Sequence, residues 1–299
     1  KAFGGSYCVS EMVACEQLAR ARLDMVRRAA GAGVIAPLVI QLAGREPRWM
    51  AEGARMAEAA GAEVIDINMG CPAKSVTSGL CGSALMRDPA TALRLIEATA
   101  GATTLPVTLK MRLGWDHASL NAPDIARSAE AAGVRMLTIH GRTRNQLFTG
   151  VADWAAIAPV VDAVTIPVIA NGDIASASDA RRALSLSGAA GVMIGRAAQG
   201  RPWLPGAIEH ALKQGGEAAA PSRARLLASL LSLYEDTLEF YDRRLGVRVA
   251  RKHIAWTIDA VFGAAARERR KAVCTLEDPS RVRAELRALF ECEAGLAAA

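Results

Sequence analysis

Residues 47–69 read PRWMAEGARMAEAAGAEVIDINM, and they contain one complete repeating unit of the fold. The first part, residues 47–60, is amphipathic and rich in Ala, and Gly61 after it suits the C-cap of a helix. The second part, residues 63–69, is a short and mostly apolar run, which is typical of a buried strand. This stretch therefore predicts a helix followed by a strand.

The same unit recurs on both sides of this stretch. Long amphipathic segments that alternate with short apolar runs indicate a parallel sheet covered by helices. Strands are predicted at residues 7–13, 37–42, 63–69, 106–111, 134–140, 167–171 and 191–195, and helices at residues 16–30, 47–60, 89–100, 122–132, 154–161 and 178–186.

The number of strands bears on the fold class, because the common closed form of this pattern has eight strands and seven are found. The chain starts at Lys1, and residues 1–6 look like the end of a helix, so we expect that a first strand and most of its helix are missing. We therefore predict an α/β (β/α)8 TIM barrel that lacks its first strand. An open doubly wound parallel sheet is the alternative.

The chain changes character after Gly195, where only helical periodicity remains. Helices are predicted at residues 223–241, 247–262 and 280–293, and the polar residues 214–217 before Pro221 indicate a linker. We predict a barrel domain at residues 1–203, a linker at 204–220 and a small helical domain at 221–299.

The composition excludes several classes of protein. With 299 residues, 52% of them hydrophobic, the chain is neither collagen-like nor of low complexity. The six cysteines lack CxxC spacing and the density of a small secreted domain, so we expect reduced thiols and no metal site. No long uncharged apolar run or signal peptide is found, and we expect a cytoplasmic protein that does not enter a membrane.

The positive charge is concentrated near the C-terminus. The formal net charge is +6, and residues 241–271 alone contain nine basic and three acidic residues. One face of the helical domain is therefore expected to contact a polyanion, although a solvated helix face is about as common an explanation.

Polar residues follow the predicted strands, at the end of the barrel where active sites lie in this architecture. Buried polar groups need partners, and one shared polar ligand would satisfy all of them, whereas separate solvation explains any one alone. These residues are Glu11, Gln41, Asn68, Lys110, Arg112, His140, Arg142, Asn171, Asp173 and Arg196.

The last two strands are followed by a pattern typical of phosphate binding. Asn171-Gly172-Asp173 precedes a helix, and Gly195-Arg196 follows the last strand. Loops after the last two strands form the usual phosphate site of such barrels, where Gly permits close backbone approach and Arg provides a bidentate contact.

The turn Gly70-Cys71-Pro72 is expected to raise a thiol into the mouth of the barrel. A thiol in a mostly apolar pocket stays protonated at neutral pH, which suits a general acid better than a nucleophile. A buried structural thiol is the alternative. Cys81 lies ten residues further on, but zinc would need additional Cys or His residues at short spacing, and none is present.

Several of these motifs together resemble the tRNA-dihydrouridine synthases. They are residues 65–72 (IDINMGCP) with Lys74, residues 82–85 (GSAL), 110–115 (KMRLGW), 140–143 (HGRT), 169–173 (IANGD) and 193–196 (MIGR). Residues 10–13 (SEMV) and 251–254 (RKHI) are similar to the bacterial B-type, nitrogen-regulation-like branch. The family's first barrel strand has no counterpart in this sequence.

The resemblance implies an FMN-containing barrel with a helical tRNA-binding domain, which reduces a uracil base in tRNA with NADPH. We also expect a monomer. It implies that Cys71 protonates C5 of uracil while hydride reaches C6, and that Asn68 and Arg142 lie beside the base. Gln41, Lys110 and His140 would contact the flavin ring. The ribityl chain and phosphate would be held by Asn171, Gly172, Asp173, Gly195 and Arg196, and the RNA by Arg251 and Lys252.

Two other functions are compatible with the residues. A flavin barrel of the dihydroorotate dehydrogenase type would use the cysteine as a base on a free pyrimidine, but it would not explain the basic helical domain. A non-catalytic RNA-binding or regulatory protein on a flavin scaffold is the other alternative.

Overall fold

The computed structural model describes residues 2–77, 80–216 and 219–291. The chain forms two compact units, Lys1–Gly195 and Arg196–Ala299. No helix in the described ranges is long and apolar enough to cross a membrane.

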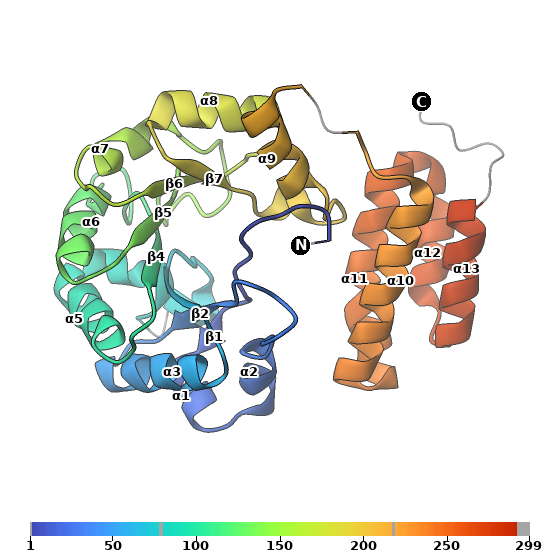
Figure 1. Cartoon of the computed structure of the whole chain (residues 1–299), viewed down its shortest axis with the longest axis horizontal. Coiled ribbons are helices and arrows are strands. Elements are labelled where there is room, and N and C mark those ends of the chain that lie inside the picture. Colours follow the sequence, from blue (N-terminus) through green and yellow to red (C-terminus); the bar gives the residue numbers. More distant parts are fainter. Residues whose placement is uncertain (1, 78–79, 217–218, 292–299) are drawn as a thin grey trace. The chain divides into compact units, whose positions relative to one another are not determined.

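The first unit is a seven-stranded parallel sheet in which the strands follow their order in the sequence, β1 to β7. The sheet curves, and the helices that follow the strands lie around its outside (Figure 1). This arrangement confirms the predicted TIM-barrel-like α/β fold, with β1 and β7 as sheet edges within the described residues. The strands are β1 (Val13–Ala14), β2 (Val39–Ala43), β3 (Val64–Met69), β4 (Val107–Arg112), β5 (Met136–His140), β6 (Val168–Asn171) and β7 (Gly191–Met193).

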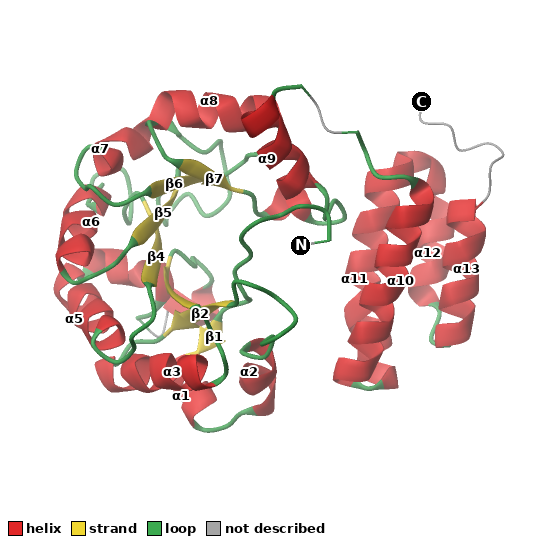
Figure 2. Ribbon diagram, viewed as in Figure 1, coloured by secondary structure: helices red, strands yellow, loops and turns green. Residues whose placement is uncertain are grey.

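Helices connect these strands, and Figure 2 shows them alternating with the strands of the sheet. They are α1 (Cys15–Ala19), α2 (Leu23–Arg28), α3 (Pro47–Ala59), α4 (Lys74–Thr77), α5 (Pro89–Ala100), α6 (Ala122–Ala131), α7 (Ala158–Val161) and α8 (Ala177–Ser187), with 3-10 helices η1 (Gly82–Arg87) and η2 (Ala155–Ile157).

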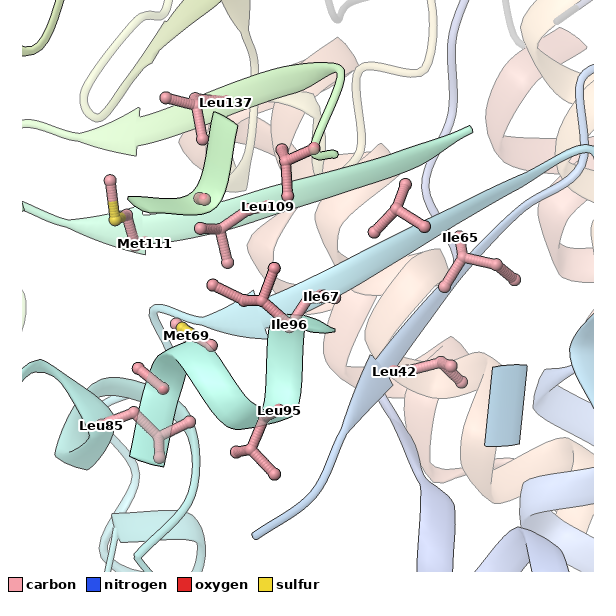
Figure 3. Close-up of a cluster of buried hydrophobic side chains, with 14 of the residues drawn as sticks. Leu42, Ile65, Ile67, Met69, Leu85, Leu95, Ile96, Leu109, Met111 and Leu137 are labelled. Carbon is pink, nitrogen blue, oxygen red and sulfur yellow. The ribbon is translucent and has the colours of Figure 1, made fainter. Parts of the chain in front are cut away.

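Side chains alternate between the two faces of each strand, because successive residues of a strand point to opposite sides. Ile65, Ile67 and Met69 of β3 pack with Leu95 and Ile96 of α5 in the core between sheet and helices (Figure 3). The intervening residues of β3 are polar, and they belong to the other face. The sheet therefore has an apolar outer face that holds the helices and a polar inner face.

The first predicted strand, residues 7–13, is wrong over most of its length. Only Val13 belongs to β1, and Val9 forms an isolated bridge to Val39. The Ser10 hydroxyl oxygen accepts from the backbone N–H of Gln41 (3.0 Å), in the position that a strand carbonyl would occupy. One extra residue lies between the two paired positions, since Val9 pairs with Val39 but Val13 pairs with Leu42. A side-chain hydrogen bond therefore replaces part of the ladder.

Two further expectations near the N-terminus differ from the structure. Residues 2–6 are not helical, and the helix predicted at 16–30 is divided into α1 and α2. The division falls at Ala21, whose φ of 52° is incompatible with a continuous right-handed helix.

In the second unit, every secondary-structure element among residues 196–216 and 219–291 is a helix. Its elements are η3 (Arg196–Ala198), α9 (Leu204–Gln214), α10 (Arg223–Tyr241), α11 (Arg243–Phe262), η4 (Gly263–Ala266), α12 (Arg267–Thr275) and α13 (Pro279–Glu291). Phe262 and Phe290 meet edge to face with ring centroids 5.0 Å apart, which joins α11 to α13.

The linker predicted at 204–220 is instead helical over its first half, where α9 lies. Leu204, Ile208 and Ala211 are buried on one face of α9, and this helical spacing explains why the segment folds. Residues 217–218 and the end of the helix predicted at 280–293 lie outside the described residues.

Candidate active site

The polar inner face carries most of the residues that were predicted at the strand ends. Asn68 of β3 pairs in register with Lys110 of β4, and His140 of β5 pairs with Asn171 of β6. Gln41 of β2 pairs in register with Asp66 of β3. Polar side chains from five consecutive strands therefore lie at one end of the sheet, where barrel enzymes bind their ligands.

Gln41 and Asn68 belong to one hydrogen-bonded group. The Asn68 Nδ2 donates to Gln41 Oε1 (2.7 Å), and Gln41 Nε2 donates to Asp66 Oδ2 (2.6 Å). The Asn68 Oδ1 accepts from the backbone N–H groups of Gly70 (3.2 Å) and Cys71 (3.0 Å). Asn68 thus connects the amide of Gln41 to the turn that carries the thiol.

Lys110 and Asn171 form the second group. The Lys110 Nζ donates to Asn171 Oδ1 (3.1 Å), and Asn171 Nδ2 donates to the carbonyl of Met193 on β7 (2.9 Å). Burial lowers the pKa of Lys110 to about 8, while the nearby carboxylate of Asp66 acts in the opposite direction. Only one of the three ammonium donors has an acceptor in the described part of the chain, so the others are available to a ligand.

His140 is held as a neutral imidazole. Burial lowers its pKa to about 3, and the charges of Lys110, Arg112 and Arg142 add to this effect. The Arg142 Nη1 lies 3.3 Å from His140 Nε2. Because a guanidinium has donors only, Nε2 is the acceptor and the ring proton is on Nδ1.

Arg142 was predicted to lie beside the substrate, but its guanidinium is fully engaged within the chain. Its side chain is 2% exposed and forms a bidentate ion pair with Asp173. It also donates to the carbonyls of Thr149 (3.1 Å) and Gly150 (2.6 Å). This arrangement favours a positioning role, in which Arg142 holds the loop after β5 against the end of β6.

The residues predicted to bind phosphate occupy the turns after β6 and β7. Asp173 has a left-handed backbone (φ 55°), and its carboxylate also accepts from the backbone N–H of Ala152 (2.8 Å). Gly172 has φ 115°, and a Cβ there would lie 2.9 Å from His140 Cδ2. By contrast, a Cβ at Gly195 would meet nothing within 4 Å, so a ligand can approach this backbone closely. Arg196 begins η3 in the second unit.

Cys71 lies two residues after the end of β3, just past the strand end as predicted. It is partly exposed, and its carbonyl accepts from both the backbone N–H (3.0 Å) and the hydroxyl (2.9 Å) of Ser83. With Asn68 on its N–H, the backbone of Cys71 is held on both sides. The turn that carries the thiol is therefore held by hydrogen bonds on both sides, and Cys71 is partly exposed.

Arg251 and Lys252 lie on α11 in the second unit. Arg251 lines a cavity of about 560 Å³ together with Arg243, Arg244, Arg248 and Glu277. The Nε of Arg251 is buried and has no hydrogen-bond partner within the described residues. Lys252 is exposed, and its ammonium lies 6.0 Å from the ring centroid of Trp256. The cavity thus presents several arginine side chains to an anion.

Two polar residues of the inner face, Asp66 and Thr108, were not predicted to have a function, and Arg112 was predicted only as one of the polar strand-end residues. Asp66 and Thr108 are buried on the inner face, and Arg112 donates from its buried side chain to the carbonyls of Gly70 (2.9 Å) and Thr143 (2.7 Å). The alternation of polar and apolar residues in β3 and β4 is the signal that places Asp66 beside Asn68 and Thr108 beside Lys110.

These features define a class of protein: a parallel, TIM-barrel-like α/β fold with polar side chains gathered at the carboxyl ends of its strands. No cluster of three or more potential metal ligands occurs among residues 2–77, 80–216 and 219–291. Comparison with known proteins is more specific. The model of the dihydrouridine synthase (Dus) family matches residues 1–293, and the chain belongs to this family of flavin-dependent oxidoreductases.

Individual relatives agree with this assignment. The chain is 53% identical over 290 residues to a "probable tRNA-dihydrouridine synthase" of Rhodobacter capsulatus, covering 96% of this chain and 88% of that protein. A protein with the same description from Rhizobium leguminosarum is 49% identical, over 95% of this chain and 87% of the relative. A "tRNA-dihydrouridine synthase B" of Xanthomonas axonopodis is 46% identical, over 86% of this chain and 77% of the relative.

Proposed function

We propose that this protein is a tRNA-dihydrouridine synthase that uses FMN and NADPH to reduce the C5–C6 double bond of a uridine in tRNA. The family assignment and the descriptions of the relatives support this function. The observation that carries it is the connection of Gln41 to the Cys71 turn through Asn68, since this joins a ligand-facing amide and an accessible thiol in one unit.

The donors of the site fit FMN. Lys110 and Gln41 each retain a donor without an acceptor in the described residues, and the flavin pyrimidine ring carries carbonyl oxygens that accept hydrogen bonds. The open backbone at Gly195 fits a phosphate, with Arg196 as its bidentate partner. We assign the ring to Gln41, Lys110 and His140, and the ribityl phosphate to Asn171, Gly172, Asp173, Gly195 and Arg196.

Cys71 acts as the proton donor of the reaction. When bound, FMN that has been reduced by NADPH supplies the hydride that adds to uracil C6. Negative charge then develops at C5 and O4, so the proton and the hydrogen-bond donors must already be in position. Cys71 holds its proton at Sγ and transfers it to C5, and the remaining N–H of Asn68 stabilises the base.

Arg142 and His140 shape the site without carrying the proton. The ion pair of Arg142 with Asp173 fixes the loop after β5, and the neutral imidazole of His140 adds no charge beside Lys110. The ammonium of Lys110 would place a positive charge beside the ring of a bound flavin.

The second unit is assigned to the RNA. A uracil must leave the base stack before its reacting carbons can be reached, so the enzyme must hold the rest of the tRNA meanwhile. The arginine-lined cavity and Lys252 on α11 suit phosphate groups of the RNA backbone. We propose that the protein acts in the cytoplasm as a monomer, without a metal ion.

The decisive variant is Cys71→Ala, with Cys81→Ala as the matched control. Purified Cys71→Ala should stay yellow and form no dihydrouridine in unmodified tRNA, whereas Cys81→Ala should form it at the wild-type rate. Normal product from Cys71→Ala would remove this thiol from the mechanism.

The wild-type protein separates the competing functions in the same assay. A yellow protein that transfers electrons from free dihydroorotate-like substrates to an added electron acceptor but ignores tRNA would be a dehydrogenase of the other type. A colourless protein that binds tRNA without modifying it would be an RNA-binding protein.

A further inference from the structure

Asp66 is a buried carboxylate that the proposed chemistry does not use. It lies in the middle of β3, and its residue is only 3% exposed. A buried carboxylate is costly unless its oxygens accept hydrogen bonds. The Asp66 Oδ1 accepts from the hydroxyl of Thr108, and Oδ2 accepts from Gln41 Nε2 (2.6 Å).

Three consecutive hydrogen bonds connect the Cys71 turn to Asp66, and in each of them the donor is the group farther from Asp66. The Cys71 N–H donates to Asn68 Oδ1 (3.0 Å), Asn68 Nδ2 donates to Gln41 Oε1 (2.7 Å), and Gln41 donates to Asp66. Hydrogen bonds aligned in this way polarise one another and strengthen the chain. The chain runs from the thiol-bearing turn to the carboxylate without a reversal.

Both ends of the chain determine how the two amides are oriented. Burial raises the pKa of Asp66, while hydrogen bonds from Thr108 and Gln41 and the charge of Lys110 lower it. In its ionised form the carboxylate accepts only, so it requires the NH₂ group of Gln41. The backbone N–H of Cys71 donates only, so it requires the carbonyl oxygen of Asn68. The orientation has a consequence for binding. Gln41 and Asn68 each keep one side-chain N–H for a ligand, so neither amide offers the ligand its carbonyl oxygen alone.

We propose that Asp66 is a positioning residue that sets the direction of the hydrogen bonds from Cys71 to Asp66. In this direction Gln41 and Asn68 present N–H donors to carbonyl oxygens of the flavin and the uracil, and Asn68 also holds the Cys71 turn. The identity of the ligands rests on the proposed function. The polarity of the chain is a property of the protein alone.

The other groups near Asp66 favour its ionised form and so act against the burial that raises its pKa. The carboxylate lies close enough to Lys110 and Tyr7 to act on both electrostatically. The ammonium of Lys110 balances its charge on the inner face. The hydroxyl of Thr108 satisfies the oxygen that Gln41 does not contact.

The first test uses Asp66→Asn in the ¹⁵N-labelled full-length chain. Asn has the shape of Asp but can donate, so the Gln41 amide can reverse and the bond from Asn68 is lost. We expect the side-chain amide resonances of Gln41 and Asn68 and the backbone amide resonance of Cys71 to shift. Thr108→Val is the matched control, because it removes a hydrogen bond from the same carboxylate without reversing an amide, and it should leave the Cys71 resonance in place.

A double variant distinguishes loss of polarity from general damage. In Asp66→Asn with Gln41→Glu, the new Asn donates to the new Glu, whose other oxygen again accepts from Asn68. The Cys71 resonance should return toward its wild-type position, although the donor at position 41 is lost to the ligand. A Cys71 resonance that is the same in wild type and Asp66→Asn, or one that the double variant does not restore, would overturn the proposal.

The second test measures the bound flavin and turnover. We expect Asp66→Asn to shift the absorption maximum of the bound flavin. We also expect kcat to fall by about 10- to 100-fold, which is the usual effect of losing a residue that orients a ligand-binding side chain. The KM for tRNA should stay within about twofold of the wild-type value. A wild-type spectrum and kcat in Asp66→Asn would overturn the inference while leaving the proposed function intact. A wild-type protein that makes no dihydrouridine would instead contradict the proposed function. The amide resonances would still test the direction of the hydrogen bonds between Cys71 and Asp66.

Discussion

Lys110 is the residue whose charge should determine how flavin binding depends on pH. Burial lowers the pKa of Lys110 to about 8, so the free site loses this cation as the pH rises through about 8. A ligand that prefers the ammonium form then binds less tightly, and we expect FMN affinity to be about tenfold lower at pH 9 than at pH 7. His140 does not contribute, since its pKa of about 3 keeps it neutral throughout this range.

Fluorescence titration of FMN at a series of pH values measures this dependence. Lys110→Met should bind FMN weakly and with the same affinity from pH 7 to pH 9. Cys71→Ala should keep the wild-type dependence, which separates the amine from the thiol. A pH dependence that survives in Lys110→Met would assign the effect to another group.

Single residues also show where the sequence was sufficient and where it was not. The strand-end rule identified Gln41, Asn68, Lys110 and Asn171, and their hydrogen bonds join them into two groups in the structure. The engagement of Arg142 could not be predicted, because its acceptors at Thr149 and Gly150 come from a loop with no periodic signal. The roles of these residues toward FMN and uracil stay predictions.

At the scale of secondary-structure elements, the turns after β6 and β7 contain two glycines with opposite surroundings. A Cβ at Gly172 would lie 2.7 Å from Ala152 Cβ and close to His140, and the residue has φ 115°. Gly172→Ala should therefore lower stability by about 1–3 kcal/mol and weaken FMN binding as well, since strain at the turn displaces the imidazole. A Cβ at Gly195 meets no protein atom within 4 Å.

Gly195→Ala thus serves as the matched variant. It should unfold at the wild-type temperature but bind FMN about tenfold less tightly. This loss is expected if the added methyl group prevents one charge-assisted hydrogen bond between the protein and the phosphate. Thermal unfolding and FMN titration of both variants separate the two effects. Wild-type FMN affinity in Gly195→Ala would place the phosphate elsewhere.

Elements were predicted well where periodicity and packing agree. The helix at residues 223–241 coincides with α10, because its apolar face is long and buried within its own unit. The strand at residues 7–13 failed because its ladder depends on the Ser10 hydroxyl, which replaces a backbone acceptor. The expected linker begins too early, because residues 204–214 form α9, whose buried residues recur at helical spacing.

At the scale of the whole molecule, catalysis and RNA binding are assigned to different units, so a variant should be able to affect one without the other. Arg244 and Arg248 are exposed on α11, four residues apart, and both line the arginine-rich cavity. None of the residues assigned to the flavin lies on α11. Charge removed from α11 should therefore weaken tRNA binding and leave flavin content unchanged.

The variant Arg244→Gln with Arg248→Gln tests this separation through its salt dependence. Each lost phosphate contact removes counterion release, so the slope of log K for tRNA against log salt should fall by about one per arginine. Arg127→Gln, which removes an exposed charge from α6 in the first unit, is the control and should keep the wild-type slope. An unchanged slope in the double variant, measured by filter binding from about 50 to 200 mM salt, would mean that the RNA contacts a different face. A loss of flavin together with tRNA affinity would mean that the two units do not act independently.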